Sequence, residues 1–159
     1  MNQEKLCFIN RSTPGGGKSH QTEELKKHFP GLGVCSADHK FETPEGYEFI
    51  PWLIPVAHQE SQYKFFELVS TGHPVVVVDN TNCQQWEFKN YIQQASFFGY
   101  RVIIVDLLPE TLEEALEMGV RNSHGVPMEA IEGMFNRLEP NPEGFEVIRP
   151  DKGLKKQAA

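Results

Sequence analysis

Three consecutive glycines followed by a lysine and a serine form the most informative short segment of the sequence. Residues 15–17 are glycine, and Lys18 and Ser19 follow directly. Glycine tolerates a positive φ, so successive backbone N–H groups can converge on an anion. A lysine ammonium here neutralises phosphate charge, and the serine hydroxyl is suited to Mg²⁺. The segment therefore predicts a turn that binds nucleotide phosphates, although Ser12 stands where the strict pattern has a glycine.

A second candidate, Asp79, comes at the end of a nearly pure valine run. Residues 74–78 have the composition of a parallel strand that is covered on both faces. Ligands bind at the carboxyl ends of parallel strands, so Asp79 is expected to hold magnesium through water or to orient an acceptor. The alternative is an ordinary turn residue. Asn82, three residues further on, is expected to contact the acceptor as well.

Asp38 follows a shorter apolar run at residues 33–36 and should reach the same edge of the sheet. Transfer of a phosphoryl group to a hydroxyl needs a base within hydrogen-bond reach of the acceptor oxygen. Asp38 is the candidate for that base, and the alternative is a carboxylate that caps a helix or turn. His58 lies in a helix-like segment near the expected acceptor cleft, where a surface or capping role is the alternative.

Arg121 begins the segment that bridges two helix-like stretches near the C-terminus. Negative charge gathers on the equatorial oxygens during phosphoryl transfer, and an arginine carried by a mobile lid can stabilise it. The alternative is a solvated arginine that offsets the dipole at a helix end. In residues 40–55, Tyr47 and Trp52 could stack on a nucleic-acid base, and ordinary packing is the favoured interpretation.

The elements that must position these side chains alternate between strand-like and helix-like segments, which predicts a parallel sheet. Strands are expected over residues 6–10, 33–36, 74–78, 101–107 and 145–148. Helices are expected over residues 20–28, 57–71, 86–98, 110–120 and 127–138. Residues 40–55 contain three prolines and are expected to form a loop region. The predicted fold is α/β, with about five parallel strands flanked by helices and a small lid near residues 121–127.

Composition limits the classes of function. The chain has 159 residues, which fits one domain over residues 1–150 and a polar tail over residues 151–159. A net charge of −7 argues against strong non-specific binding to duplex nucleic acid. Three scattered cysteines are typical of a reducing compartment. No apolar run approaches the ~20 residues that span a membrane, and the predicted location is cytoplasmic.

The sequence resembles the kinase domain of polynucleotide 5′-hydroxyl kinases and their small P-loop relatives, which include zeta-toxin-like kinases. The resemblance is carried by residues 11–19, 36–38, 79–82, 121–122, 126–127, 139–140 and 143–145. It implies that Asp38 activates the acceptor hydroxyl, that Lys18 and Ser19 serve ATP and magnesium, and that Arg121 comes from the lid. The chain departs from the family pattern at Ser12, His20, Phe41, His124 and Gly125.

These observations predict an ATP- and Mg²⁺-dependent kinase that phosphorylates a hydroxyl, first of all a nucleic-acid 5′-hydroxyl. A hydroxymethylated base in DNA and a small nucleoside-like molecule are alternative acceptors, and a nucleotide-binding protein without kinase activity is a third possibility. The predicted catalytic residues are Asp38, Lys18 and Arg121. The predicted nucleotide contacts are Thr13, Pro14, Gly15, Gly16, Gly17, Lys18, Ser19, His20 and Arg121. Acceptor contacts are assigned to Asp38, His58, Asp79 and Asn82, and magnesium ligands to Ser19 and Asp79.

Overall fold

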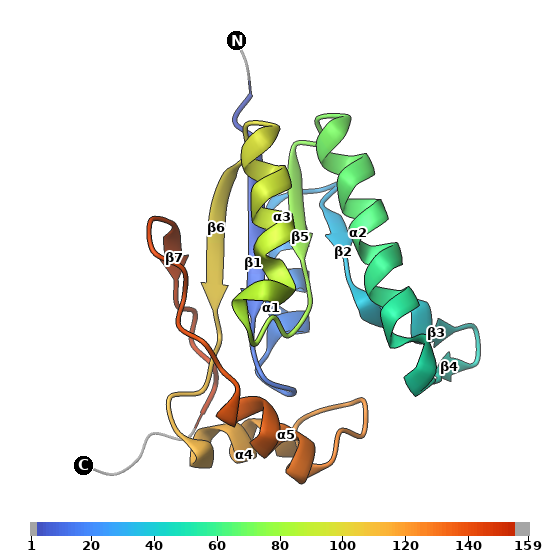
Figure 1. Cartoon of the computed structure of the whole chain (residues 1–159), viewed down its shortest axis with the longest axis vertical. Helices are drawn as coiled ribbons and strands as arrows, with labels where there is room; N and C mark the ends of the chain where they lie inside the picture. Colours follow the sequence, from blue (N-terminus) through green and yellow to red (C-terminus); the bar gives the residue numbers. More distant parts are fainter. Residues whose placement is uncertain (1–2, 155–159) are drawn as a thin grey trace.

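A five-stranded sheet forms the centre of the computed structural model, which describes residues 3–154 (Figure 1). Its strands lie in the order β2-β5-β1-β6-β7, and every neighbouring pair is parallel. Their bounds are Leu6–Arg11 for β1, Gly33–Cys35 for β2, Val75–Val78 for β5, Arg101–Asp106 for β6 and Glu146–Ile148 for β7. The expected α/β fold with about five parallel strands is confirmed.

Helices cover both faces of this sheet. The helices in the described part of the chain are α1 (Lys18–His28), α2 (Ile54–Ser70), α3 (Gln85–Phe97), α4 (Leu112–Val120) and α5 (Met128–Asn136), and the first three pack on the sheet. On one face, α2 and α3 bury Phe65 and Phe88 against the strands. On the other, α1 contributes Leu25. In Figure 1, α4 and α5 lie together beyond one end of the sheet, away from the α2–α3 layer.

Strand β1 shows why the sheet is covered on both sides. Side chains alternate between the two faces of a strand. Cys7 and Ile9 accordingly join the cluster under α2 and α3, whereas Phe8 joins the cluster on the α1 side. The four valines of β5 divide in the same way and are all buried. Such continuous apolar runs are expected for central parallel strands, and they leave the strand ends to carry the polar residues.

The expectation of a loop over residues 40–55 is only partly correct. A 3₁₀ turn over Ala37–Phe41 leads into a two-stranded hairpin of β3 (Glu42–Thr43) and β4 (Gly46–Tyr47). A further 3₁₀ turn over Pro51–Leu53 then leads directly into α2, which begins at Ile54 rather than at residue 57. Pro55 does not block this start, because the first N–H groups of a helix have no partner within it. The hairpin strands have two residues each, too few to show an alternating pattern.

The expected polar tail is anchored where the structure describes it. Lys152 donates from Nζ to the carbonyl of Leu108 at 3.0 Å and lies 3.5 Å from a carboxylate oxygen of Glu114. Lys155 and Lys156, which belong to the expected polar tail, lie outside the described residues. In residues 3–154, no helix is both long enough and apolar enough to cross a membrane.

Candidate active site

The glycine-rich turn connects β1 to α1 with a backbone that requires glycine. Gly15 and Gly17 have φ values of 80° and 92°, in the left-handed region. A Cβ atom on Gly15 would lie 1.8 Å from the carbonyl oxygen of Met118, and one on Gly16 would lie 2.7 Å from Cβ of Ser12. Because α1 begins at Lys18, the free N–H groups of its first turn lie at this turn. This concave backbone geometry suits an anion.

Ser12 does not disturb this turn. Its side chain is fully buried, and its backbone N–H donates to the carbonyl of Thr81 at 2.9 Å. Among the described residues other than glycine, a positive φ occurs at Asn82, so Ser12 has a conformation that any residue can adopt. The glycine of the strict pattern is therefore not required at this position. Thr13 and Pro14 are also buried, and the Thr13 hydroxyl lies 3.7 Å from the sulfur of Met118.

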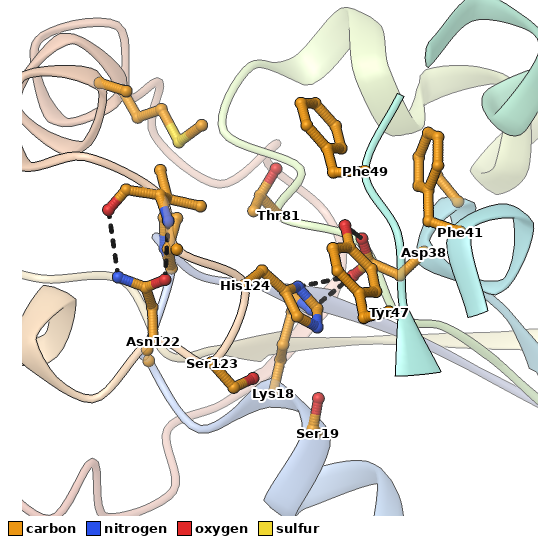
Figure 2. A pocket seen from close by; sticks show the side chains of 18 of the residues that line it. Lys18, Ser19, Asp38, Phe41, Tyr47, Phe49, Thr81, Asn122, Ser123 and His124 are labelled. Carbon is orange, nitrogen blue, oxygen red and sulfur yellow. Dashed lines mark hydrogen bonds and ion pairs between the residues drawn. The ribbon is translucent and has the colours of Figure 1, made fainter. Parts of the chain in front are cut away.

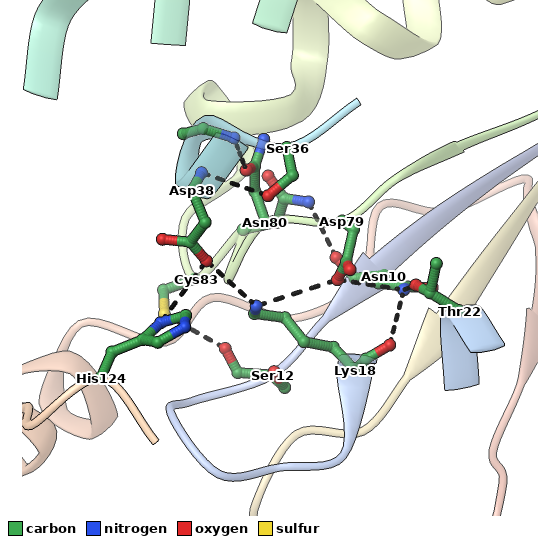
Figure 3. Close-up of polar contacts among 12 residues, drawn as sticks. Asn10, Ser12, Lys18, Thr22, Ser36, Asp38, Asp79, Asn80, Cys83 and His124 are labelled. Carbon is green, nitrogen blue, oxygen red and sulfur yellow. Dashed lines mark hydrogen bonds and ion pairs between the residues drawn. The ribbon is translucent and has the colours of Figure 1, made fainter. Parts of the chain in front are cut away.

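Lys18 lies between two carboxylates from neighbouring strands. Its Nζ is 3.6 Å from Oδ2 of Asp38 and 3.8 Å from Oδ1 of Asp79 (Figure 3). Asp38 follows β2 and Asp79 follows β5, which are adjacent in the sheet. The side chain of Lys18 is 13% exposed, so water screens these contacts only partly. Three residues that were singled out separately in the sequence thus meet at one edge of the sheet.

The segment after β5 binds its neighbours together. Asp79 donates its N–H to the carbonyl of Cys35 at 2.8 Å, and the amide oxygen of Asn80 accepts from the N–H of Ala37 at 2.9 Å. These two bonds link the end of β5 to the end of β2. The segment therefore fixes the position of the loop that carries Asp38.

Asn82 belongs to this framework and does not line the cavity. It is 1% exposed, and its amide donates to the carbonyl of Asn10 at 2.8 Å. Its own carbonyl accepts from Nε of the buried Arg11 at 2.8 Å. The Asn82 amide thus satisfies a buried backbone oxygen, and acceptor contact by Asn82 stays a prediction that this position does not favour.

The carboxylate of Asp38 faces the cavity and does not cap its turn. Ser36 is the capping residue, since its hydroxyl accepts from the N–H of Asp38 at 3.2 Å. The hydroxyl of Tyr47 donates to Oδ1 of Asp38 at 3.1 Å, and Nδ1 of His124 lies 3.7 Å from Oδ2. Burial, with the nearby Asp38 charge second, raises the pKa of Tyr47 well above its ordinary value. Tyr47 therefore remains a hydrogen-bond donor at neutral pH.

Tyr47 and His124 stack on each other, and the sequence analysis did not find this contact. The ring centroids are 4.0 Å apart and the ring planes differ by 3° (Figure 2). Tyr47 comes from the hairpin and His124 from the segment between α4 and α5. No local pattern links residues so distant in the chain. The one available signal was that an aromatic residue and a histidine occurred in the two segments expected to flank the acceptor.

A cavity of about 750 Å³ joins the glycine-rich turn to Asp38, the hairpin, α2 and the segment before α5. His58 and Thr81 line it, and contact of His58 with an acceptor stays a prediction. Much of its wall is apolar and is formed by Phe41, Phe49, Ile54, Ala57, Val126, Ala130 and Met134. Trp52 is not among the lining residues and is 79% exposed.

Charge around this wall is not basic in the described part of the hairpin region. Lys40 is paired with Glu60 at 2.9 Å, and Glu42, Glu45 and Glu48 are exposed. A groove that tracks a nucleic-acid backbone would carry cations here. The wall therefore offers flat apolar surface and few charges to an acceptor.

The segment over residues 121–127 has the position expected of a lid. Asn122 shapes it: the amide oxygen accepts from the N–H of Val126 at 2.9 Å, and the amide nitrogen donates to the carbonyl of Gly119 at 2.7 Å. Arg121 lines the cavity, but its side chain is exposed and Nη1 lies 3.5 Å from the carbonyl of Gly153. Arg121 is thus near the cavity without an ion pair to the predicted active-site carboxylates.

The residues at the turn fit a magnesium nucleotide. Ser19 and His20 are exposed on the first turn of α1 and line the cavity. Within residues 3–154, no group of three or more His, Cys, Asp or Glu side chains is placed to hold a metal ion. Magnesium at a phosphate site needs only one or two protein oxygens, because water and phosphate supply the others. Ser19 and Asp79 are the oxygen donors that suit this chemistry.

No protein-family model matches the sequence. Among curated proteins, the chain is similar to human NEDD4-binding protein 2, with 30% identity over 136 residues. The match covers 84% of the chain but 8% of that much longer protein.

Solved structures with the same arrangement include a fungal RNA kinase, with a TM-score of 0.63 and 17% identity over 99% of this chain and 79% of that one. A gluconokinase from Sinorhizobium meliloti 1021 has a TM-score of 0.58 and 13% identity, covering 97% of this chain and 86% of that one. At these identities the likeness shows the fold alone, an α/β arrangement that this chain shares with those two kinases.

Proposed function

We propose that this protein is a Mg²⁺- and ATP-dependent kinase that transfers the γ-phosphate to a hydroxyl group. The acceptor that we favour is a nucleic-acid 5′-hydroxyl. The observation that carries this proposal is the position of Lys18 between Asp38 and Asp79, directly at the glycine-rich turn. A turn that only bound phosphate would not need a carboxylate facing an adjoining cavity. A base beside the phosphate site is what transfer to a hydroxyl requires.

The nucleotide half of the site uses backbone groups and one ammonium. The N–H groups of residues 15–19 bind phosphate oxygens, and Lys18 neutralises charge on the β- and γ-phosphates. Magnesium, when bound through Ser19 and Asp79, would supply further neutralisation of the phosphate oxygens. Arg121 would contact the transferring group after its side chain leaves the carbonyl of Gly153.

The acceptor half moves a proton. Asp38 accepts the hydroxyl proton of the acceptor on a carboxylate oxygen, and the acceptor oxygen forms a bond to the γ-phosphorus. The bond from that phosphorus to the β–γ bridging oxygen breaks, and ADP leaves. Lys18 must exchange its contact with Asp38 for phosphate oxygens, which frees Oδ2 of the carboxylate for this role.

The apolar wall supports an acceptor that carries a flat ring. Phe41 and Phe49 lie edge to face with centroids 5.2 Å apart and line the cavity together with Ile54. Nucleic-acid bases stack on such surfaces. A fungal RNA kinase shares this fold, which supports a nucleic-acid acceptor for this protein as well. A base next to the reactive 5′-hydroxyl would fit this wall.

A second candidate acceptor is a small nucleoside-like molecule. The observation that favours it is the charge of the hairpin region, where three exposed glutamates accompany one paired lysine. A longer strand would bring phosphates close to these carboxylates. The free nucleoside avoids that repulsion and still stacks on the wall. A hydroxymethylated base in DNA stays a further alternative, because it carries both a ring and a hydroxyl.

Labelled ATP tests the function directly. The protein is incubated with [γ-³²P]ATP and, separately, with 5′-hydroxyl DNA and RNA oligonucleotides, DNA with hydroxymethylated bases, and free nucleosides. We expect label on the 5′ end of an oligonucleotide and none with the same oligonucleotide already phosphorylated at that end. Label on nucleosides alone would identify the acceptor as a small nucleoside-like molecule, the second candidate. ATP binding without label on any acceptor would replace the kinase by a nucleotide-binding protein.

A further inference from the structure

Three side chains surround the Asp38 carboxylate, and each comes from a different segment of the chain. Tyr47 of β4 donates its hydroxyl to Oδ1 at 3.1 Å. Lys18 of α1 and His124 of the lid segment lie on the other oxygen, with Nζ and Nδ1 at 3.6 and 3.7 Å from Oδ2 (Figure 3). The two carboxylate oxygens therefore have different neighbours, so the orientation of the carboxylate is defined.

The phenol of Tyr47 is held firmly as a donor. Burial comes first among the causes that raise its pKa, followed by the charge of Asp38, the hydrogen bond to it and the charge of Glu42. The hydroxyl of Tyr47 thus stays protonated at neutral pH. A neutral hydroxyl beside a carboxylate can donate to it without competing for the acceptor proton, and such bonds to charged groups are stronger than neutral ones.

The ring of Tyr47 is itself fixed from two directions. His124 stacks flat on it at 4.0 Å between centroids (Figure 2), and Phe41 packs edge to face at 6.1 Å. Phe41 belongs to the turn that also carries Asp38, whereas His124 belongs to the segment between α4 and α5. The stack consequently ties the lid segment to the hairpin at the place where the hairpin contacts Asp38.

We propose that Tyr47 is a positioning residue for Asp38, and that His124 couples this position to the lid. The inference rests on the proposed function, in which Asp38 is the base. The bond at Oδ1 restricts rotation of the carboxylate. Once Lys18 has moved to the phosphates, Oδ2 can accept from the acceptor hydroxyl with His124 still 3.7 Å away. When the lid segment moves away, the stack is lost and Tyr47 is free to leave the carboxylate, so proton transfer is efficient only with the lid in place.

Tyr47→Phe tests the positioning role, because it keeps the ring and both ring contacts and removes only the hydroxyl. We expect kcat to fall roughly tenfold through loss of orientation, with KM for ATP and for the acceptor unchanged. The matched control is Tyr63→Phe, since Tyr63 is 68% exposed on α2 and does not line the cavity. An unchanged kcat in Tyr47→Phe, with active wild-type protein, overturns the positioning role.

The double variant tests the coupling. If His124 acts through Tyr47, His124→Ala lowers kcat as well, and Tyr47→Phe has less effect in the His124→Ala background than in the wild type. Effects that simply multiply would mean that His124 does not act through Tyr47, and that half of the proposal would then be abandoned.

A third measurement does not depend on activity. The near-ultraviolet absorbance difference between wild type and Tyr47→Phe at neutral pH isolates the contribution of the Tyr47 ring. In an Asp38→Asn background this difference should move to shorter wavelength, because the hydrogen bond from the phenol to a charged carboxylate is replaced by a weaker one to a neutral amide. An unmoved difference spectrum overturns the contact, whereas absence of label transfer by wild type overturns only the proposed function.

Discussion

The glycine-rich turn and the apolar wall face the same cavity but are built differently. Residues 12–19 form the turn with their own backbone, and glycine is required where Gly15 approaches the carbonyl of Met118. The wall instead depends on side chains from the hairpin, α2, the lid segment and α5. A contiguous segment determines the phosphate half, whereas the acceptor half depends on tertiary packing. We therefore expect the first half to tolerate fewer substitutions and the second to determine acceptor choice.

Removal of the ammonium at the turn should have the largest effect. Lys18→Met leaves Asp38 and Asp79 without their shared cation. In the proposed function it also removes the charge that stabilises the transferring phosphoryl group. Label transfer should fall by roughly 100- to 1,000-fold, the range seen when one preorganised transition-state donor is lost. Lys64→Met, on the exposed surface of α2, serves as the control. Comparable losses in both variants would show that the turn has no special role.

A methyl group added at Gly15 should have the next largest effect, because it lowers the stability of the folded protein. In Gly15→Ala the new Cβ meets a backbone oxygen at 1.8 Å, so the segment must shift. We expect a loss of about 3 kcal/mol in the free energy of unfolding, measured by denaturant titration. Gly31→Ala is the matched control: its φ is 89° but nothing lies within 4 Å of the new atom, so the cost should be about 1 kcal/mol.

A substitution in the apolar wall should change only the binding of the acceptor. Phe49→Ala removes a half-exposed ring that lines the cavity beside Phe41. Loss of one stacking surface should raise KM for the acceptor roughly tenfold and leave KM for ATP unchanged. Phe97→Ala, at an 83% exposed position on α3 outside the cavity, should change neither constant. A rise in KM for ATP in Phe49→Ala would contradict the division into two halves.

The smallest effect concerns the α2–α3 layer that supports the wall. Tyr91 of α3 donates its hydroxyl to Ser61 of α2 at 2.9 Å, and burial raises the pKa of Tyr91 to about 12. The pKa of Tyr91 in the folded protein lies above the unfolded value of about 10. Its contribution to the free energy of unfolding is therefore fully present below pH ~10 and is lost as the pH approaches 12. At pH ~11 the loss should be about 1 kcal/mol. Denaturant titrations of wild type and Tyr91→Phe should show a weaker pH dependence in the variant.

The same contrast explains what the sequence could predict. Strands β1 and β5 were recognisable because both are buried on both faces: β5 is apolar throughout, and β1 is apolar over residues 6–9. The meeting of Lys18, Asp38 and Asp79 followed from the rule that the carboxyl ends of parallel strands share an edge. Both inferences need only local composition and the order of the elements.

Other features needed contacts that no local pattern reveals. The Tyr47–His124 stack joins two segments whose separate sequences show no sign of pairing. Asn82 looked like a site residue because it is polar and follows Asp79, yet its amide satisfies a buried carbonyl. The hairpin was missed because its strands have two residues each. Tertiary packing decided each of these cases.

The central claim is that Asp38 is a base beside a phosphate site, and one variant tests it most directly. Asp38→Asn keeps the size of the side chain and can still accept from Tyr47, but it cannot take a proton from an acceptor hydroxyl. Label transfer and ATP affinity are measured on the same preparation. We predict that transfer is abolished while the dissociation constant for ATP stays within about threefold of wild type. Transfer at the wild-type rate would contradict the assignment of Asp38.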